Sequence, residues 1–178
     1  MPSETSTRRR IYVASSWRNL EYPALVAELR AEGHEVYDFR NAPHGASFAR
    51  WDEIDPGWTH WTPERYSHLV TTHPRARQGF DSDKAALDWC DTCVLLLPCG
   101  RSAHLEAGYA SGQGKEVVVR LSPERFEPEL MYLLCSAIAQ SDAQVLAFLR
   151  RPVHVACDLS GVGTASSRAI AALKPEGI

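Results

Sequence analysis

A glutamate stands near the start of a predicted helix that directly follows an apolar strand. The strand is predicted at 92–97 (TCVLLL), and the helix at 102–113 carries His104 and Glu106 in its first turns, with Ser102 as its N-cap. The helix dipole keeps a carboxylate in this position ionised. An ionised carboxylate can act as a nucleophile or stabilise a cationic sugar centre. Spacing alone favours the simpler alternative, in which Glu106 only complements the dipole of an exposed helix.

A second group of polar side chains follows the first predicted strand, residues 10–14. A strand-to-helix turn directs backbone N–H groups and the positive end of the helix toward an anion. Two hydroxyls and a guanidinium here suit a phosphate or sugar hydroxyls, and Trp17 offers a ring face to a base. The residues leave open that Ser16 or Asn19 caps the helix and that Trp17 lies in the core. The turn consists of Ser15, Ser16, Trp17, Arg18 and Asn19.

Three further groups of reactive side chains have simpler explanations. Asp81 and Asp83 precede a predicted short helix at 83–90 and are by themselves typical of an N-cap. Cys90 and Cys93 match the C-x-x-C redox pattern, but they run from a helix end into an apolar strand, with no second pair at zinc spacing. We therefore interpret them as buried structural cysteines. Four scattered histidines give little support for a metal cluster: His44, His60, His68 and His73.

The predicted elements alternate as in a doubly wound open parallel α/β sheet of the flavodoxin or Rossmann-like kind. Strand 10–14, helix 20–32 and strand 34–39 form a β-α-β unit, with Pro23 in the first helical turn and Gly33 as the cap. The short connections imply a parallel pair with a right-handed crossover. Later elements are predicted at 92–97, 102–113, 116–119, 127–139 and 141–150, with a last edge strand at 152–158.

Ligands of such sheets bind beyond the carboxyl ends of the strands, which is where the polar turns described above lie. Residues 40–80 are predicted to be a long aromatic-rich loop with a short helix at 63–71, and a loop of this length inside a domain is usually functional. We predict a single domain at 1–159, followed by a frayed tail at 160–178.

Composition places the chain among ordinary globular proteins. It has 178 residues, of which 44% are hydrophobic and 23% charged, and its net charge of −3 provides no basic field for a nucleic acid polymer. The basic run at 8–10 is interpreted as a solvated lead-in to the first strand. No apolar run approaches the roughly 18–20 residues of a membrane span, and residues 1–10 lack the apolar region of a secretory signal. The odd count of five cysteines suits reduced thiols, so a cytoplasmic location is expected.

Together these residues resemble the nucleoside 2-deoxyribosyltransferase superfamily, which includes nucleoside 5′-monophosphate N-glycosidases. The resemblance covers residues 10–119. It is carried by the opening strand and turn at 11–17 (IYVASSW) and by an aspartate four residues before a helical leucine at 83–87 (DKAAL). Its most specific element is the helix motif at 100–110 (GRSAHLEAGYA).

The resemblance implies a mechanism and a set of site residues. Glu106 would attack C1′ of the sugar as the base leaves, and water or a second base would resolve the glycosyl–enzyme intermediate. Asp83 falls where the family places the acid that acts on the departing base. Tyr12 and Trp17 fall where it lines the pocket for sugar and base. A neighbouring subunit often completes the pocket in this family, so a homodimer or higher homo-oligomer is expected.

Two departures from the family pattern favour a phosphorylated substrate. The transferases commonly carry an acidic residue six positions before the nucleophile, where this chain has Gly100. Arg18, Arg101 and Ser102 stand where the monophosphate glycosidases tend to bind the 5′-phosphate, and His104 is predicted to line the same site.

We therefore predict an N-glycosidase of nucleoside 5′-monophosphates. No cofactor is expected, because neither a G-x-G-x-x-G nor a P-loop pattern follows a strand. The alternatives are deoxyribosyl transfer between free nucleosides and a non-catalytic nucleotide-binding module, since a fold alone does not separate these functions. A redox role for the C-x-x-C pair is a third alternative.

Overall fold

The chain folds as two compact units. The computed structural model describes residues 8–48, 50–152 and 171–172. One unit contains the described residues up to Val36 together with those from Cys90 onward, and the other is Tyr37–Trp89. The sequence predicted one domain at 1–159 with a loop at 40–80; most of that loop segment is helical and it belongs to the second unit.

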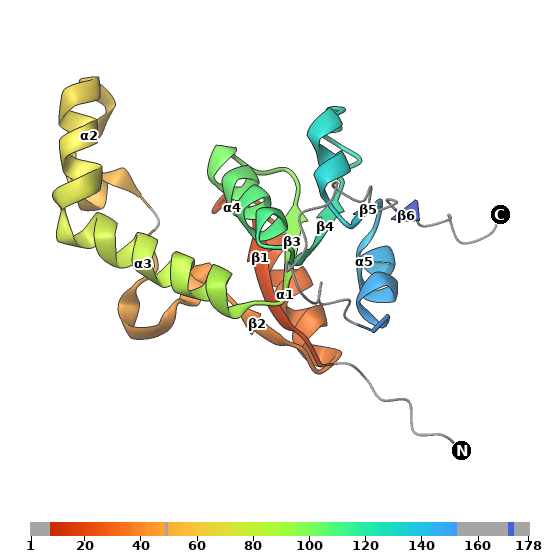
Figure 1. The fold of residues 1–178 in the computed structure, drawn as a ribbon. Helices are drawn as coiled ribbons and strands as arrows, with labels where there is room; N and C mark the ends of the chain where they lie inside the picture. The colour runs from red at the N-terminus through yellow and green to blue at the C-terminus, as the bar shows by residue number, and fades with distance from the viewer. Residues whose placement is uncertain (1–7, 49, 153–170, 173–178) are drawn as a thin grey trace, which may run out of the picture. The chain divides into compact units, whose positions relative to one another are not determined.

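The first unit is an open parallel sheet, which confirms the predicted fold class (Figure 1). The strand order is β2-β1-β3-β4-β5-β6. Four neighbouring pairs are parallel: β1 with β3, β3 with β4, β4 with β5, and β5 with β6. The chain passes from β1 to β2 and then returns to β3 on the other side of β1, so the switch point lies between β1 and β3. The strands are β1 (Arg10–Ala14), β2 (Glu35–Tyr37), β3 (Thr92–Leu96), β4 (Glu116–Arg120), β5 (Ala137–Ala139) and β6 (Ala171–Ala172).

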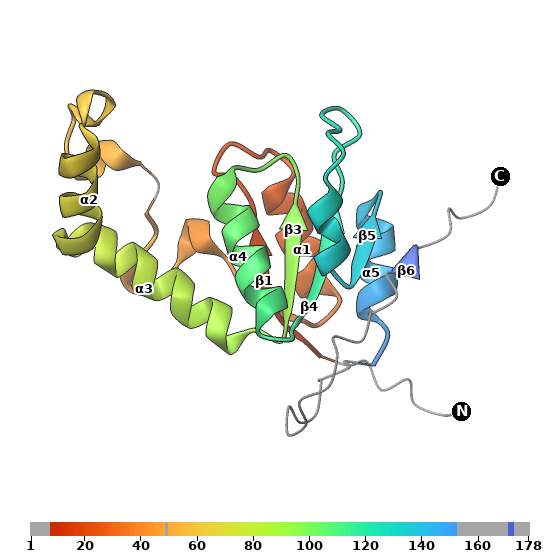
Figure 2. The same ribbon diagram turned by 45° about the horizontal axis from the view of Figure 1, so that its top comes forward.

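Helices cover both faces of this sheet. Figure 2 shows α4 (Arg101–Gly112) on one face, with α1 (Tyr22–Ala31) and α5 (Asp142–Leu149) on the other. The ends of α1 and α5 are joined by an ion pair of 3.1 Å between Arg150 and Glu32. No helix in the described part of the chain combines the length and apolar character that a membrane span needs.

The local signals for the central elements are confirmed. All five residues of β3 are buried, as expected of a parallel strand covered on both faces. Pro23 lies in the first turn of α1, and Gly33 follows that helix with φ +90°, a conformation that glycine adopts without a Cβ penalty. Strand β2 is shorter than predicted, because the Asp38 carboxylate accepts a hydrogen bond from the Arg40 N–H and starts a 3-10 turn.

The helix predicted at 127–139 is wrong. This segment forms a 3-10 helix, η5 (Leu130–Leu134), followed by strand β5. The strand forms because the Ser136 N–H donates to the Val117 carbonyl at 2.7 Å, so pairing with β4 overrides the apolar run. The edge strand predicted at 152–158 lies outside the described residues apart from Pro152, and Ala171–Ala172 of the predicted tail pair with β5.

The second unit has a small cluster of partly exposed aromatic rings in place of the predicted loop. The Trp51 ring contacts three aromatic rings at centroid distances of 5.1 to 5.9 Å: Phe48, Trp61 and Tyr66. A Cβ on Gly79 would lie 2.6 Å from the Phe48 Cβ, so this close contact requires glycine. The elements are η1 (Phe39–Asn41), η2 (Pro43–Gly45), η3 (Trp51–Glu53), η4 (Trp58–His60), α2 (Pro63–Thr72) and α3 (Pro74–Trp89).

The middle residue of the basic run is buried, which corrects its interpretation as solvated. Arg9 is 0% exposed, and its guanidinium forms an ion pair with Glu116, which is 6% exposed. It also donates to the Thr92 hydroxyl at 3.0 Å, to the Leu149 carbonyl at 2.8 Å and to the Arg151 carbonyl at 2.7 Å. One side chain thus joins the amino-terminal ends of three strands to the end of α5.

We expect Arg9→Ala to lower the free energy of unfolding by about 3–5 kcal/mol, because it leaves the buried Glu116 carboxylate without its cation. Urea denaturation followed by circular dichroism measures this change. The matched control is Arg8→Ala, whose side chain is 68% exposed. Its ion pair with Glu35 is worth at most about 1 kcal/mol. Equal losses in the two variants would contradict a special role for Arg9.

Candidate functional site

The two polar turns predicted from the sequence are joined by hydrogen bonds at the switch point. The Ser15 hydroxyl, after β1, donates to the Leu96 carbonyl at the end of β3, at 2.9 Å. The Asn19 amide nitrogen donates to the Ser15 hydroxyl at 3.1 Å and to the Pro98 carbonyl at 3.2 Å, and its oxygen accepts from the Glu21 N–H. Asn19 is 3% exposed, so its amide holds the framework of the site together.

The other side chains of the first turn differ in exposure. Trp17 is 37% exposed, so the alternative that placed it in the core is wrong. The Ser16 hydroxyl accepts from the Arg18 N–H at 3.1 Å, and the Arg18 side chain is exposed, with no hydrogen bond or ion pair to any described residue. Tyr12, predicted to line the pocket, is 1% exposed within β1.

Helix α4 begins one residue earlier than predicted. Its N-cap is Gly100 in an extended conformation, so Ser102 lies inside the first turn and is not the N-cap. Arg101 and Ser102 are both exposed at this end of the helix. The positive end of the α4 dipole, an exposed guanidinium and an exposed hydroxyl are therefore found together just beyond β3.

Glu106 is half-buried on a flank of α4. Each helical residue turns by about 100°, so Glu106 lies beside the stripe that faces the sheet, while His104 lies on the opposite flank. The residues of the buried stripe are Ala103, Ala107 and Ala110. Alanine at these positions lets the helix pack closely on the sheet.

Three cysteine thiols of the first unit have raised pKa values. Burial, and to a lesser extent the negative Glu106 carboxylate, raise the pKa of Cys99 to about 12. Burial, with Glu106 among the lesser causes, also raises the pKa of Cys93 well above its usual value. Burial raises the pKa of Cys90 to about 11. These thiols stay protonated at neutral pH, which confirms the interpretation of the pair as buried structural cysteines and disfavours a redox role.

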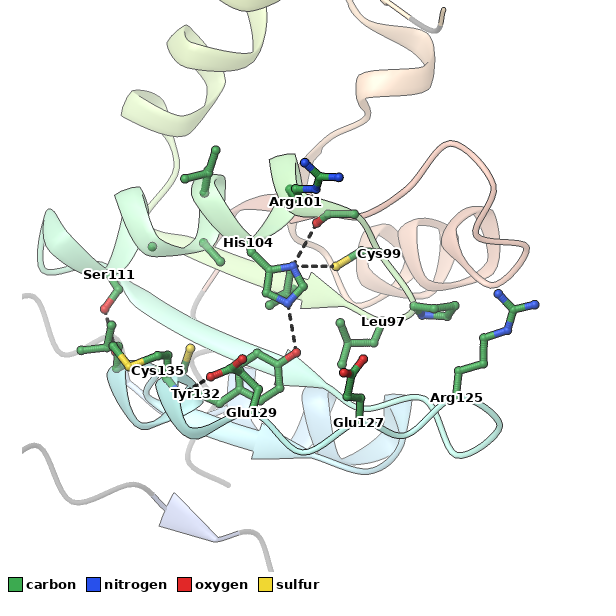
Figure 3. Close-up of a pocket in the computed structure, with 18 residues that line it drawn as sticks. Leu97, Cys99, Arg101, His104, Ser111, Arg125, Glu127, Glu129, Tyr132 and Cys135 are labelled. Atoms are coloured by element: carbon green, nitrogen blue, oxygen red, sulfur yellow. Dashed lines mark hydrogen bonds between the residues drawn. The ribbon is translucent and has the colours of Figure 1, made fainter. Parts of the chain in front are cut away.

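A pocket of about 890 Å³ lies on the His104 flank of α4 (Figure 3). It is lined by the end of β3, by α4 and by residues in the segment 125–135. His104 spans it: Nδ1 lies 2.9 Å from the Gly100 carbonyl, and Nε2 lies 3.1 Å from the Tyr132 hydroxyl. A carbonyl only accepts, so Nδ1 carries the proton and the Tyr132 hydroxyl donates to Nε2.

His104 was predicted to bind substrate, but in the structure both of its ring nitrogens form hydrogen bonds with other groups of the protein. It holds the loop before α4 to the segment that carries Tyr132. Neither Tyr132 nor the segment 125–135 was predicted to line a site. The apolar run at 130–134 was the one signal there, and it predicted a helix where the structure has η5.

Asp83 belongs to the second unit, whereas Glu106 belongs to the first. The prediction that Asp81 and Asp83 cap a short helix is wrong, because both lie inside the long helix α3. The Tyr37 hydroxyl donates to Asp83 Oδ1 at 2.9 Å. Burial raises the pKa of Asp83, and the hydrogen bond from Tyr37 opposes part of this shift. Its environment thus shifts Asp83 toward the protonated form relative to an exposed aspartate.

Across the residues that the structure describes, no three side chains of His, Cys, Asp or Glu gather as metal ligands would.

Comparisons with known proteins give matches in structure only. No protein-family model matches the sequence, and no curated protein matches it significantly. The chain is similar to a 2-deoxyribosyltransferase from Bacillus psychrosaccharolyticus, with 21% identity, 78% of this chain and 94% of that chain covered, and a TM-score of 0.48. It is also similar to the CMP N-glycosidase BcmB of Clostridium botulinum, with 17% identity, 80% and 100% coverage, and a TM-score of 0.45. Similarity at this level assigns no activity.

We expect Tyr37→Phe to raise the pKa of Asp83 further. The phenol donates to the carboxylate and so stabilises its ionised form, which means that removing the phenol favours the protonated form. An NMR titration of the Asp83 carboxyl carbon measures the shift. Tyr66→Phe, a change at a 48% exposed tyrosine of the same unit, is the control and leaves the titration unchanged. A lowered or unmoved pKa in Tyr37→Phe would contradict this account.

Proposed function

We propose that the protein cleaves the N-glycosidic bond of a (deoxy)nucleoside 5′-monophosphate, with Glu106 as the nucleophile. The observation that carries this proposal is the position of Glu106 on a helix that starts at the β1/β3 switch point, where the two polar turns are hydrogen-bonded together. The resemblance of residues 100–110 to the superfamily motif supports the same role.

The reaction proceeds in two displacements at the same carbon. A Glu106 carboxylate oxygen attacks C1′, the bond from C1′ to the base nitrogen breaks, and the base leaves with a proton. Water then attacks C1′, releasing the sugar phosphate and restoring the carboxylate. This is the retaining route of carboxylate glycosidases. The first step requires the ionised form of Glu106.

Asp83 is the proposed acid for the departing base. Its raised pKa supports this role, since a general acid must hold its proton until the leaving group takes it. In this proposal Glu106 acts in its ionised form and Asp83 in its protonated form, the division of roles found in two-carboxyl glycosidase sites.

The 5′-phosphate is proposed to bind where the two turns meet. Arg18 and Arg101 are both exposed, and neither side chain has a hydrogen bond or ion pair to the described part of the chain. Guanidinium groups form paired, charge-assisted hydrogen bonds with phosphate oxygens. The hydroxyls of Ser16 and Ser102 stand beside these arginines in sequence and can donate to the same anion.

Glu106→Gln is expected to reduce base release by several orders of magnitude and to leave the fold intact. An amide is a poor nucleophile, and the remaining groups only bind and polarise the substrate. Chromatography of the released base measures turnover, and circular dichroism checks the fold. The control is Glu28→Gln, at an exposed glutamate of α1. Substantial residual turnover would point to another nucleophile or an inverting route. A wild type that binds nucleotides but releases no base would indicate the non-catalytic module.

Asp83→Asn is expected to slow substrates with poor leaving bases more than those with good ones. General acid catalysis contributes roughly 10²–10⁴-fold, and it matters most when the leaving base is strongly basic. The variant should also lose the decline in rate at high pH that follows from ionisation of Asp83, because its folded pKa is raised. Asp81→Asn, on the same helix and exposed, is the control. Equal losses on activated and natural substrates would rule out the acid role.

Arg18→Ala is expected to remove most of the preference for a monophosphate over the matching nucleoside. A charge-assisted contact contributes about 1.5–3 kcal/mol, which is roughly a ten- to hundredfold effect on kcat/KM. Turnover of the free nucleoside should change little, and Arg8→Ala should leave both rates unchanged. If the wild-type protein uses the nucleoside as well as the monophosphate, the phosphate site is wrong and deoxyribosyl transfer becomes the better assignment.

A further inference from the structure

Tyr132 and His104 form a chain of hydrogen bonds that ends at the start of α4 (Figure 3). Tyr132 is 8% exposed at the centre of η5, and its hydroxyl donates to His104 Nε2 at 3.1 Å. Nδ1 of the same ring donates to the Gly100 carbonyl at 2.9 Å. The two rings are stacked, with an interplanar angle of 13°. The chain thus runs from a phenol through an imidazole to the backbone carbonyl of the N-cap residue.

The groups at its two ends set the direction of this chain. The carbonyl only accepts, so Nδ1 carries the proton of the neutral imidazole and Nε2 is the acceptor. Burial raises the pKa of Tyr132 to about 12, with neighbouring thiols and carboxylates as lesser causes. The phenol therefore keeps its proton at neutral pH and is the donor to Nε2.

The segment that carries Tyr132 is held by contacts of its own. The Ser111 hydroxyl of α4 donates to the Leu134 carbonyl at 2.6 Å. The Glu129 carboxylate accepts from the Met131 N–H at 2.9 Å at the start of η5. Because η5 is fixed in this way, the phenol is presented to the imidazole from a firm backbone. The Ser111 contact also joins η5 to α4 without passing through the imidazole.

The acceptor at the end of the chain belongs to the peptide group between Gly100 and Arg101. A trans peptide group is planar, so its carbonyl and its N–H point in opposite directions. This N–H is that of Arg101, the first residue of α4, and the first N–H groups of a helix have no acceptor within the helix. Such groups are available to an anion. Hydrogen bonds in a chain polarise one another, so a bond to the carbonyl strengthens the N–H as a donor.

We propose that Tyr132 is a positioning residue for the substrate phosphate, which acts through His104 on the peptide group between Gly100 and Arg101. This inference rests on the proposed function, because it takes the 5′-phosphate to bind at the start of α4. The imidazole fixes the plane of the peptide group, and the chain makes the Arg101 N–H a stronger donor to a phosphate oxygen. The chain takes no part in the attack on C1′, so it acts on binding of the phosphate alone.

Tyr132→Phe tests this role through the separation of KM from kcat. The variant keeps the stacked ring and loses only the hydroxyl. The KM for a nucleoside monophosphate should rise roughly two- to tenfold, the effect of losing one neutral hydrogen bond. The kcat for that substrate, and kcat/KM for the matching free nucleoside, should stay within about twofold of the wild-type values. The matched control is Ser111→Ala, which removes the other bond between α4 and η5 and should keep the wild-type KM.

NMR spectra of the ligand-free protein test the hydrogen-bond chain without any substrate. At a pH where the imidazole is neutral, wild-type His104 should carry its proton on Nδ1, and Tyr132→Phe should populate the tautomer protonated on Nε2. The amide proton of Arg101 should move upfield in this variant, because its peptide group is less polarised. Ser111→Ala should leave both signals unchanged.

His104→Gln is the second variant, because glutamine lacks the pair of ring nitrogens that joins Tyr132 to Gly100. It should raise the KM for the monophosphate as Tyr132→Phe does. The double variant should be no worse than His104→Gln alone, since the two residues act in one chain. Circular dichroism checks that each variant keeps the wild-type fold.

The outcomes separate a positioning role from a general loss of structure. A KM for the monophosphate that rises in Tyr132→Phe and not in Ser111→Ala, together with a shifted Arg101 amide, supports the proposal. An equal rise for the nucleoside, an equal rise in Ser111→Ala, additive effects in the double variant, or an unmoved Arg101 amide overturns it. A wild type without preference for the monophosphate overturns the proposed phosphate site and the binding role with it, whereas the ligand-free spectra still decide whether the chain polarises the Arg101 N–H.

Discussion

The buried guanidinium of Arg9 constrains the whole sheet. A charge removed from water is tolerated only when an opposite charge and hydrogen-bond acceptors surround it. Glu116, Thr92 and the carbonyls at the end of α5 meet this demand only when β1, β3 and β4 start at matching heights. Because parallel strands of equal length run from there side by side, their carboxyl ends reach the same edge, where the candidate site lies.

At the carboxyl ends of the strands, some side chains hold the two turns together by hydrogen bonds, and others remain exposed to solvent. Ser15 and Asn19 form hydrogen bonds that connect the first turn to the end of β3. His104 and Tyr132 do the same for the loop before α4. Arg18, Arg101 and Ser102 stay exposed on this fixed framework, as polar groups must be if they are to bind a ligand without rearrangement.

The two carboxyl groups proposed for catalysis lie in different surroundings. Glu106 lies near the buried thiols of Cys93 and Cys99, and its carboxylate contributes to the raised pKa of both. Burial raises the pKa of Asp83, and the Tyr37 hydroxyl, which donates to its carboxylate, opposes part of this shift. The environments of two residues of the same chemical kind can suit them to different roles, and the proposed assignment of acid and nucleophile follows this principle.

Local pattern determined a large part of this protein. The apolar runs predicted β1, β3 and β4, and Pro23 and Gly33 predicted the two ends of α1. The helix of small residues that carries Glu106 was also predicted. Each of these signals lies within a single element. Tertiary structure decided the rest. The basic run at 8–10 was predicted to be solvated, but Arg9 is buried against hydrogen-bond partners that lie 83 to 142 residues away in the sequence. Pairing with β4 turned a predicted helix into β5. The pairs Tyr37–Asp83 and His104–Tyr132 join residues 46 and 28 positions apart, and no periodicity within a single element can show which distant side chains share a hydrogen bond.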